Sequence, residues 1–199
     1  MGSVIVITSG KGGTGKTSLT GGVGASLALL GKQVLCLDGD VGLRNLDITL
    51  GMTDAALMDF SDVMAGRCDL SRAAVPHPTV SGLHLLTAPL TLPGDFPGEA
   101  GFQALLQQAR EAYDYVLIDS PAGLGPGFRL AVCGADRAIV VAVSDPSSLR
   151  DAQRVVTQLS QLETIHLVVN RVRPRLLRRQ NTTIDDAMDV LTDESTEDM

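Results

Sequence analysis

The chain has 199 residues, of which 44% are hydrophobic and 20% are charged, and its formal net charge is −7. This composition is typical of a folded globular protein and excludes a disordered or fibrous chain. No run of 18 apolar residues occurs, so the sequence pattern contains no candidate for a membrane-spanning helix.

Short aliphatic runs alternate with segments of helical periodicity along the chain. The predicted order is strand 4–8, helix 16–30, strand 33–37, helix 55–64, strand 83–88, loop 89–101, helix 102–112, strand 115–118, strand 138–143, helix 147–162, strand 165–169 and helix 183–191. This alternation predicts one α/β domain over residues 1–191, with a doubly wound, mostly parallel sheet and helices on both faces. Residues 192–199 are expected to be an acidic, disordered tail.

Negative charge is concentrated near the C-terminal end. Residues 185–199 contain seven acidic residues and no lysine or arginine, which leaves 16 acidic and 16 basic residues in the rest of the chain. The acidic balance therefore does not exclude an anionic partner for the body of the protein. Five arginines lie between positions 171 and 179. They belong either to a solvated loop and helix face or to a surface for an anionic partner.

Cysteine and histidine give no sign of a metal centre or of nucleophilic catalysis. The three cysteines are too far apart for a CxxC motif, and the one in the second strand is expected to be a core residue. The three histidines have no ligand spacing. This cysteine usage fits a reducing, cytoplasmic location. The residues concerned are Cys36, Cys68, Cys133, His77, His84 and His166.

A glycine-rich segment follows the first predicted strand and opens the first predicted helix. It reads GKGGTGKT and fits GxxxxGK[ST], the pattern of a phosphate-binding loop, in the strand–loop–helix context that the motif requires. Glycines let backbone N–H groups curve around phosphate oxygens, and the helix N-terminus adds positive potential. Lys16 is predicted to reach the β- and γ-phosphates, and Thr17 to offer its hydroxyl to Mg²⁺. The predicted nucleotide-binding residues of this segment are Gly10, Lys11, Gly12, Gly13, Thr14, Gly15, Lys16, Thr17 and Ser18.

Acidic residues follow two other predicted strands. Asp38 and Asp40 lie in the stretch LDGDVGLRNLD, and Asp119 lies in YVLIDSPAG. Ligands of open α/β sheets lie outside the carboxyl ends of the strands, so these carboxylates are expected to face the phosphates. Asp38 and Asp40 can order a water molecule or Mg²⁺ ligands, and Asp119 is expected to hold Mg²⁺ through water. The competing interpretations are a polar surface loop for the first pair and a helix cap for Asp119. The predicted metal-binding set is Thr17, Asp38 and Asp119.

Together these motifs resemble those of the MinD/ParA family of dimerising ATPases, whose deviant Walker A motif contains an additional lysine. KGGTGKT has that lysine as Lys11, DGDVGLRNLD resembles switch I of the MinD branch, and DSPAG resembles its switch II. The resemblance covers about residues 3–190 and implies a P-loop NTPase fold. It also implies that Lys11 acts in trans on the phosphates of a second subunit while Lys16 acts in cis. Asp40 would place and activate the attacking water, so the predicted catalytic residues are Lys11, Lys16 and Asp40.

Three further positions are assigned by this resemblance. Asn45 would lie near the dimer interface and the nucleotide. The pair Asn170-Arg171, at the end of the last predicted strand, matches the family's Asn-Arg pair, in which the asparagine reads the adenine edge. An amide supplies both the donor and the acceptor that adenine recognition needs. The implied cofactors are ATP and Mg²⁺.

The function that the resemblance implies is an ATP-dependent dimerising switch that hydrolyses ATP to control placement of the division site. Its partners would be division-site regulators and a second copy of the chain, with no sequence-specific nucleic acid. A ParA-type DNA-partitioning ATPase, supported by the arginine cluster, and a truncated nucleotide-binding module without turnover are the alternatives. Family members attach peripherally to the inner face of the cell membrane. The acidic C-terminal end predicts no binding to anionic membranes unless an anchor is missing from this chain.

Overall fold

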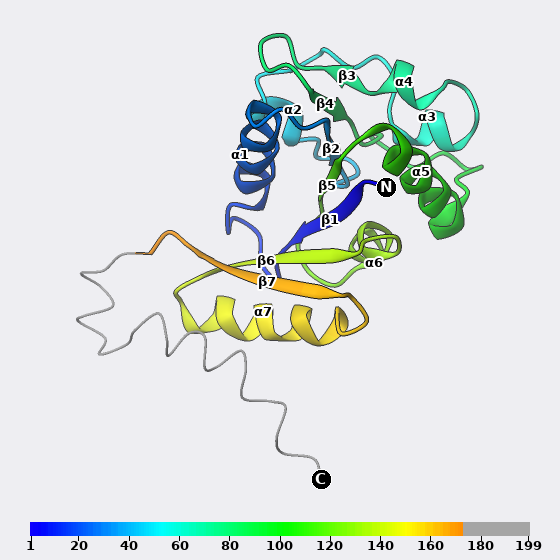
Figure 1. Cartoon of the computed structure of the whole chain (residues 1–199). Helices are drawn as coiled ribbons and strands as arrows, with labels where there is room; N and C mark the ends of the chain where they lie inside the picture. The colour runs from blue at the N-terminus through cyan, green and yellow to red at the C-terminus, as the bar shows by residue number, and fades with distance from the viewer. Residues whose placement is uncertain (173–199) are drawn as a thin grey trace.

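The structure is a computed structural model that describes residues 1–172 (Figure 1). The predicted helix 183–191, the predicted tail 192–199 and the arginines beyond Arg171 lie outside the described residues.

One sheet organises the described part of the chain, with the strand order β3-β4-β2-β5-β1-β6-β7. Its strands are β1 (Ser3–Thr8), β2 (Val34–Asp38), β3 (Val75–Pro76), β4 (Leu83–Leu86), β5 (Tyr115–Asp119), β6 (Arg137–Val143) and β7 (Thr164–Asn170). The helices are α1 (Lys16–Leu29), α2 (Leu46–Thr49), α3 (Phe60–Met64), α4 (Leu70–Ala73), α5 (Gly98–Ala112), α6 (Pro126–Val132) and α7 (Pro146–Gln158).

All neighbouring strands are parallel except the edge pair β3 and β4, which is antiparallel. The chain passes from β1 in the middle of the sheet outward to one side through β2 and β4. It then returns to β5 and continues on the other side through β6 and β7. This is the doubly wound, mostly parallel sheet that the sequence predicts. The carboxyl ends of β1, β2 and β5 lie side by side, and ligands of such sheets bind at this edge.

Alternate residues of the central strands belong to two separate apolar cores. Val4 and Val6 of β1 belong to the core that α3 to α7 cover, whereas Ile7 belongs to the core that α1 and α2 cover. In Figure 1, α1 and α7 accordingly lie against different parts of the sheet, with α7 running along β6 and β7. Both faces of the strands are therefore buried, which explains why the strands are almost continuously aliphatic.

Several predicted boundaries differ from the structure. The helix predicted from residue 55 begins only at Phe60, because Asp59 caps it there. The Asp59 carboxylate accepts hydrogen bonds from the backbone N–H groups of Ser61 and Asp62, and the Asp62 carboxylate accepts one from the Asp59 N–H. This capping box fixes the start of the helix. The helix predicted from residue 102 begins earlier, at Gly98, inside the predicted loop.

The short elements α2, α4, α6 and β3 were not predicted at all. Each has seven residues or fewer, which is too short for a hydrophobic period to be recognised in the sequence. Within residues 1–172, no helix combines the length and the apolarity that crossing a lipid bilayer requires.

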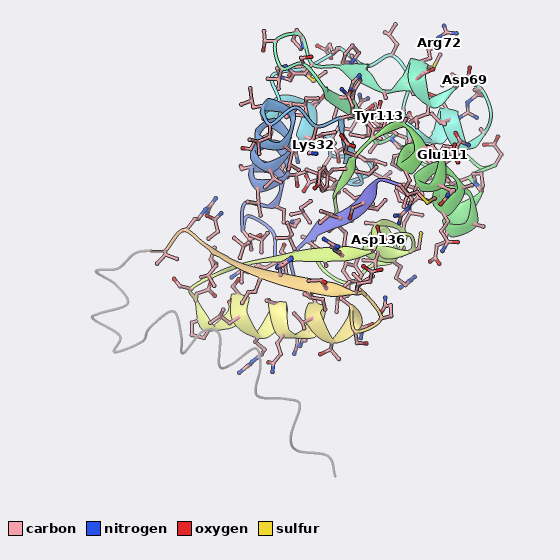
Figure 2. All side chains as sticks on the ribbon, viewed as in Figure 1. Lys32, Asp69, Arg72, Glu111, Tyr113 and Asp136 are labelled. Carbon is pink, nitrogen blue, oxygen red and sulfur yellow. The ribbon has the colours of Figure 1, made fainter. Side chains whose placement is uncertain are left out.

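The amino end of the sheet is held together by one arginine. The guanidinium of Arg110 on α5 donates to both carboxylate oxygens of Asp136, over 2.6 and 2.7 Å, and to the carbonyl oxygens of Gly2 and Gly134. The Asp136 carboxylate also accepts from the Val4 N–H at 2.9 Å. Asp136 immediately precedes β6 (Figure 2). This network joins α5, β1 and β6 at the end of the sheet opposite the predicted site.

Candidate nucleotide-binding site

The glycine-rich segment forms a tight loop between β1 and α1. Gly13 and Gly15 have φ values of 76° and 98°, a backbone region that residues with a Cβ rarely adopt. A Cβ on Gly15 would also lie 2.4 Å from Nδ2 of Asn170. No side chain caps the N-terminus of α1, and its first turn contains no acidic residue. The first N–H groups of α1 therefore retain the positive potential that binds anions.

Lys16 lies inside this loop and is 9% exposed. Burial lowers the pKa of its ammonium, while the negative charges of Asp119 and Asp40 raise it. The structure thus brings together three side chains that the sequence predicts to act on one ligand. A buried cation beside two carboxylates is a typical arrangement for a functional site.

Asp119 ends β5 and is 3% exposed. The pKa of its carboxyl is raised to about 6, mainly by burial and also by the Asp38 charge, although hydrogen bonds from Thr17 and Thr20 and the Lys16 charge act in the opposite direction. The Thr20 hydroxyl lies 3.4 Å from Oδ1 of Asp119 and 3.0 Å from the Lys16 carbonyl oxygen. The sequence motifs did not predict Thr20 as a residue of the site. The one feature that could have indicated it is its position four residues after Lys16, which places both residues on one face of α1.

Asp38 and Asp40 lie at the carboxyl end of β2, and Asp38 is the register partner of Asp119. Asp38 is 1% exposed, and burial raises the pKa of its carboxyl. Burial also raises the pKa of Asp40, while the Lys16 charge lowers it. Asn45 is exposed and stands just before α2, where its side chain makes no capping hydrogen bond. The predicted carboxylates therefore converge, whereas Asn45 remains at the surface.

Lys11 points away from this cluster within the single chain. Its ammonium donates to Oγ of Ser147 at 3.1 Å and lies 3.8 Å from Oδ1 of Asp145, and its side chain is 49% exposed. Asp145 caps α7 by accepting from the Ser148 N–H. These contacts to the start of α7 were not predicted. Lys11 also lines a hollow of about 520 Å³ between the glycine-rich loop and the end of β6, with Arg171 at its border.

Asn170 ends β7 and is joined to the glycine-rich loop. Its Nδ2 donates to the Thr14 carbonyl oxygen at 2.8 Å, and its Oδ1 accepts from the Arg171 N–H at 2.8 Å. A primary amide has two N–H groups and two acceptor lone pairs, so one donor and one acceptor position remain for a base. Arg171 is exposed and has a φ of 53°. Ser18, in the first turn of α1, is exposed.

The loop fits a phosphate group and a magnesium ion. A Cβ added at Gly12 or Gly13 would meet no atom within 4 Å, so space beside these two glycines is open. Oγ1 of Thr14, the next residue of the loop, is buried and has no hydrogen-bond partner in the described residues. No group of three or more His, Cys, Asp or Glu side chains that could hold a metal ion is found within residues 1–172. The donors present beside the loop are a hydroxyl and carboxylates, and Mg²⁺ typically binds one or two carboxylates together with water and substrate phosphates.

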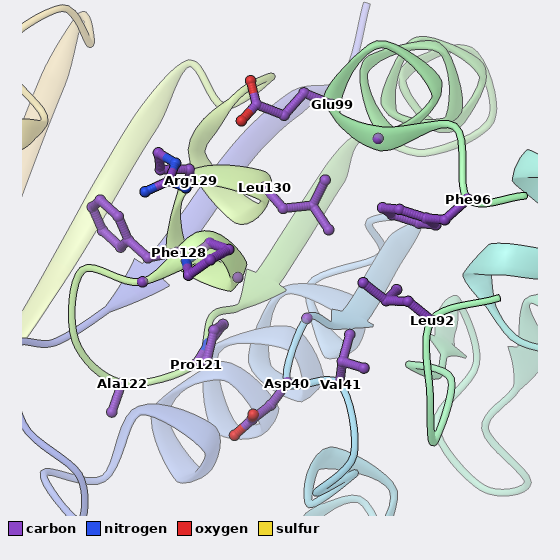
Figure 3. Close-up of a pocket in the computed structure, with 15 residues that line it drawn as sticks. Asp40, Val41, Leu92, Phe96, Glu99, Pro121, Ala122, Phe128, Arg129 and Leu130 are labelled. Atoms are coloured by element: carbon purple, nitrogen blue, oxygen red, sulfur yellow. The ribbon is translucent and has the colours of Figure 1, made fainter. Parts of the chain in front are cut away.

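A second, mostly apolar pocket of about 390 Å³ lies behind Asp40 (Figure 3). Val41, Leu92, Phe96 and Leu130 line it, and the stretch that begins at Pro121 forms another wall. In Figure 3 the side chain of Val41 points toward Leu92, whereas the Asp40 carboxylate is turned away from both. The segments after β2 and β5 therefore line one mostly apolar pocket.

Comparison with known proteins gives consistent matches. A family model described as an AAA domain matches residues 2–175. The chain is 42% identical to the septum site-determining protein MinD of Bacillus subtilis (strain 168) over 186 residues, which cover 92% of this chain and 69% of that protein. It is 39% identical to a chain of the MinC:MinD cell division protein complex of Aquifex aeolicus, with a TM-score of 0.86 and coverage of 95% of this chain and 77% of that chain.

The chain belongs to the MinD family. It is also similar to the septum site-determining protein MinD of Pyrococcus horikoshii OT3, solved with Mg-ADP, at 29% identity and a TM-score of 0.81. This match covers 96% of the chain and 78% of its relative. The predicted P-loop NTPase fold is confirmed by these MinD structures. The chain is therefore an ATPase of the MinD type with a function in placing the division septum, and the MinD branch is confirmed over the ParA-type alternative.

Proposed function

We propose that this chain binds ATP and Mg²⁺ in the loop Gly10–Thr17, dimerises in the ATP-bound form and hydrolyses ATP to ADP and phosphate. The observation that supports this most strongly is the buried Lys16, which the negative charges of Asp119 and Asp40 influence, in a loop with open space beside Gly12 and Gly13. The relative from Pyrococcus horikoshii was solved with Mg-ADP, which supports the same cofactor here.

Different residues of the protein then have different roles in phosphoryl transfer to water. The N–H groups of the loop and the ammonium of Lys16 hold phosphate oxygens and stabilise the negative charge on them. Thr17, Asp119 and Asp38 are the groups that would hold Mg²⁺, which supplies positive charge to the transferred phosphate. Asp40 orients a water molecule and accepts its proton, as its position near Lys16 allows. Asn170 uses its remaining donor and acceptor to bind adenine, with Arg171 beside it, and Asn45 lies near the nucleotide.

The proposed role of Lys11 belongs to the dimer. Among the described residues, the half-exposed Lys11 side chain makes its polar contacts with Ser147 and Asp145. We propose that it leaves these contacts and binds the phosphates of a second copy, so that ATP connects two subunits. The surface formed only in that dimer would bind division-site regulators. The Aquifex relative is solved in a complex with MinC, which supports a partner of this kind. Three free cysteines in the described part support a cytoplasmic location.

Light scattering tests this function directly. With ATP and Mg²⁺, the wild-type protein is expected to form dimers, and Lys11→Ala to remain monomeric while keeping much of its nucleotide affinity. Asp40→Ala should form dimers that persist, because hydrolysis no longer separates them. Lys32→Ala, which removes the third lysine of the chain, is the matched control and should dimerise like the wild type. Persistent dimers of Lys11→Ala, with monomers of Asp40→Ala, would contradict the mechanism.

A further inference from the structure

One carboxylate closes the loop that joins β2 to α2. Oδ1 of Asp38 accepts a hydrogen bond from the Asp40 N–H at 2.9 Å, and Oδ2 accepts one from the Leu46 N–H at 3.0 Å. These two N–H groups lie at the two ends of the loop 39–45, and Asp38 itself belongs to the rigid, central strand β2. Hydrogen bonds to an ionised carboxylate are about twice as strong as neutral ones. Asp38 therefore binds both ends of the loop to the sheet.

The same carboxylate also caps α2. The residue that usually performs this task is the one before the helix, here Asn45, but its side chain makes no capping hydrogen bond. Instead, the first N–H of α2, that of Leu46, is bound by Asp38 from the neighbouring strand. The cap is thus supplied by a residue eight positions earlier in the sequence. A helix of four residues has little stability of its own, so it depends on such contacts.

The middle of this loop is held only weakly. Gly42 and Arg44 have φ values of 92° and 46°, and for arginine this region is strained by about 1–3 kcal/mol. The Gly42 N–H donates to the Pro89 carbonyl oxygen, and the N–H groups of Leu43 and Arg44 reach the Asp40 carbonyl oxygen only at 3.2 and 3.4 Å. Such a conformation persists only if its surroundings hold it. The strongest hydrogen bonds that do so come from Asp38.

The bond to Asp40 connects this loop to catalysis. Fixing the backbone N–H of Asp40 fixes the direction in which its side chain leaves the chain. Val41, the next residue, packs against the apolar core, so the two neighbours point to different sides, as Figure 3 shows. Asp40 thereby remains close to Lys16. A small error in this direction would misplace the water that Asp40 orients, and such errors reduce rates strongly.

We propose that Asp38 is the positioning residue of the loop 39–45: its carboxylate closes the loop, caps α2 and fixes the orientation of Asp40. This inference rests on the proposed function only in its last part, the orientation of the catalytic Asp40. The closed loop is a property of the free protein and requires neither nucleotide nor Mg²⁺. A metal-binding role alone would not require it.

Limited proteolysis with trypsin tests the closed loop, since Arg44 provides a cleavage site in its middle. In the full chain without nucleotide or Mg²⁺, Asp38→Asn should raise the rate of cleavage after Arg44 at least about tenfold. An asparagine keeps one acceptor but presents an N–H₂ group to one of the two N–H donors, so the bridge opens. Cleavage after the exposed Arg154 serves as the internal reference. Asp47→Asn is the matched control, because Asp47 is buried nearby and its carboxylate accepts from the Ile48 N–H within α2 rather than from the loop 39–45.

Steady-state kinetics test the orientation of Asp40. For Asp38→Asn we expect kcat to fall at least about tenfold while KM for ATP stays within about twofold. Unchanged cleavage after Arg44, with an increased Mg²⁺ requirement as the sole effect, would overturn the proposal and leave Asp38 with the metal-binding role alone. If wild-type protein shows the protected loop but hydrolyses no ATP, the proposed function fails and the closed loop stands.

Hydrogen exchange in the wild-type protein covers the case in which Asp38→Asn does not fold. The amide protons of Asp40 and Leu46 should exchange at least about 100-fold more slowly than that of Leu43, because both are bonded to a buried carboxylate. Equal exchange at all three positions would overturn the proposal without any variant.

Discussion

The two ends of the parallel sheet use the same residue type for opposite purposes. At the amino end, the Arg110 guanidinium and the Val4 N–H hold the pKa of Asp136 below its ordinary value. At the carboxyl end, burial is the main cause that raises the pKa of Asp119 to about 6, and burial also raises that of Asp40. A carboxylate whose charge is fully paired stabilises the fold, whereas one buried with incomplete pairing destabilises it and remains available for a ligand.

The opposite pKa shifts indicate that the amino end of the sheet stabilises the fold and that the carboxyl end holds the functional site. Arg110 and Asp136 form two hydrogen bonds with each other at the end of the sheet opposite the glycine-rich loop. Lys16 and Asp119 influence each other electrostatically, but no hydrogen bond or ion pair between them is present in the described part of the chain. The two ends can therefore be separated by experiment, since substitutions at one should change unfolding and substitutions at the other should change binding.

The largest expected effect belongs to Lys16 at the carboxyl end. Lys16→Ala should lower the affinity for ATP at least about 100-fold, because it removes charge-assisted hydrogen bonds to the phosphates. Its circular dichroism spectrum should match that of the wild type. Isothermal titration calorimetry measures the affinity, and Lys32→Ala, in the exposed turn before β2, is the control that should bind normally. Equal affinity of the two variants would place the nucleotide elsewhere.

A smaller effect of a different kind is expected for Arg110 at the amino end. Arg110→Ala should lower the free energy of unfolding by about 2–3 kcal/mol, because the partly buried Asp136 loses its charged partner. ATP hydrolysis per folded molecule should be unchanged. Urea denaturation measures the first quantity and phosphate release the second. Arg154→Ala is the control, since its ion pair with Asp151 is exposed and should contribute less than about 0.5 kcal/mol.

The pH dependence of stability should show the contribution of the ion pair between Arg110 and Asp136. The pKa of Asp136 in the folded chain lies below its ordinary value of 3.8, so the folded state favours the ionised form. The stabilisation is therefore fully present above about pH 4 and is lost as the pH falls through the folded pKa. The stability difference between wild type and Asp136→Asn should be constant from pH 5 to 7 and shrink below pH 4. A difference that grew in acid would contradict the pairing.

The sequence predicted the fold class and most of the site because both depend on local patterns. Buried strands of a parallel sheet are continuous aliphatic runs, and GKGGTGKT needs only its neighbouring strand and helix to be recognised. The helix predicted over 55–64 was too long because Asp59, which ends the preceding loop, was not recognised as a cap. Its capping partner Asp62 is an aspartate, where the usual pattern has glutamate or glutamine.

Contacts between distant segments could not be predicted in this way. The bond from Asn170 to the Thr14 carbonyl oxygen spans 156 residues, and the contact of Lys11 with Ser147 spans 136. The residues were predicted as nucleotide ligands by type and position, but their partners in the free chain depend on where β7 and α7 lie in the sheet. The double role of Asp38 was likewise hidden, because its partners are backbone N–H groups that any residue type supplies.

The most direct test of the whole account is phosphate release by the purified chain with ATP and Mg²⁺. We expect the wild type to release phosphate, Asp40→Ala to bind ATP but release at least about 100-fold less, and Asp95→Ala to match the wild type. Asp95 is the suitable control because its side chain is 70% exposed and lies on the loop before α5, outside the nucleotide site. Phosphate release by Asp40→Ala at the wild-type rate would contradict the assignment of the carboxyl end of the sheet as the catalytic centre.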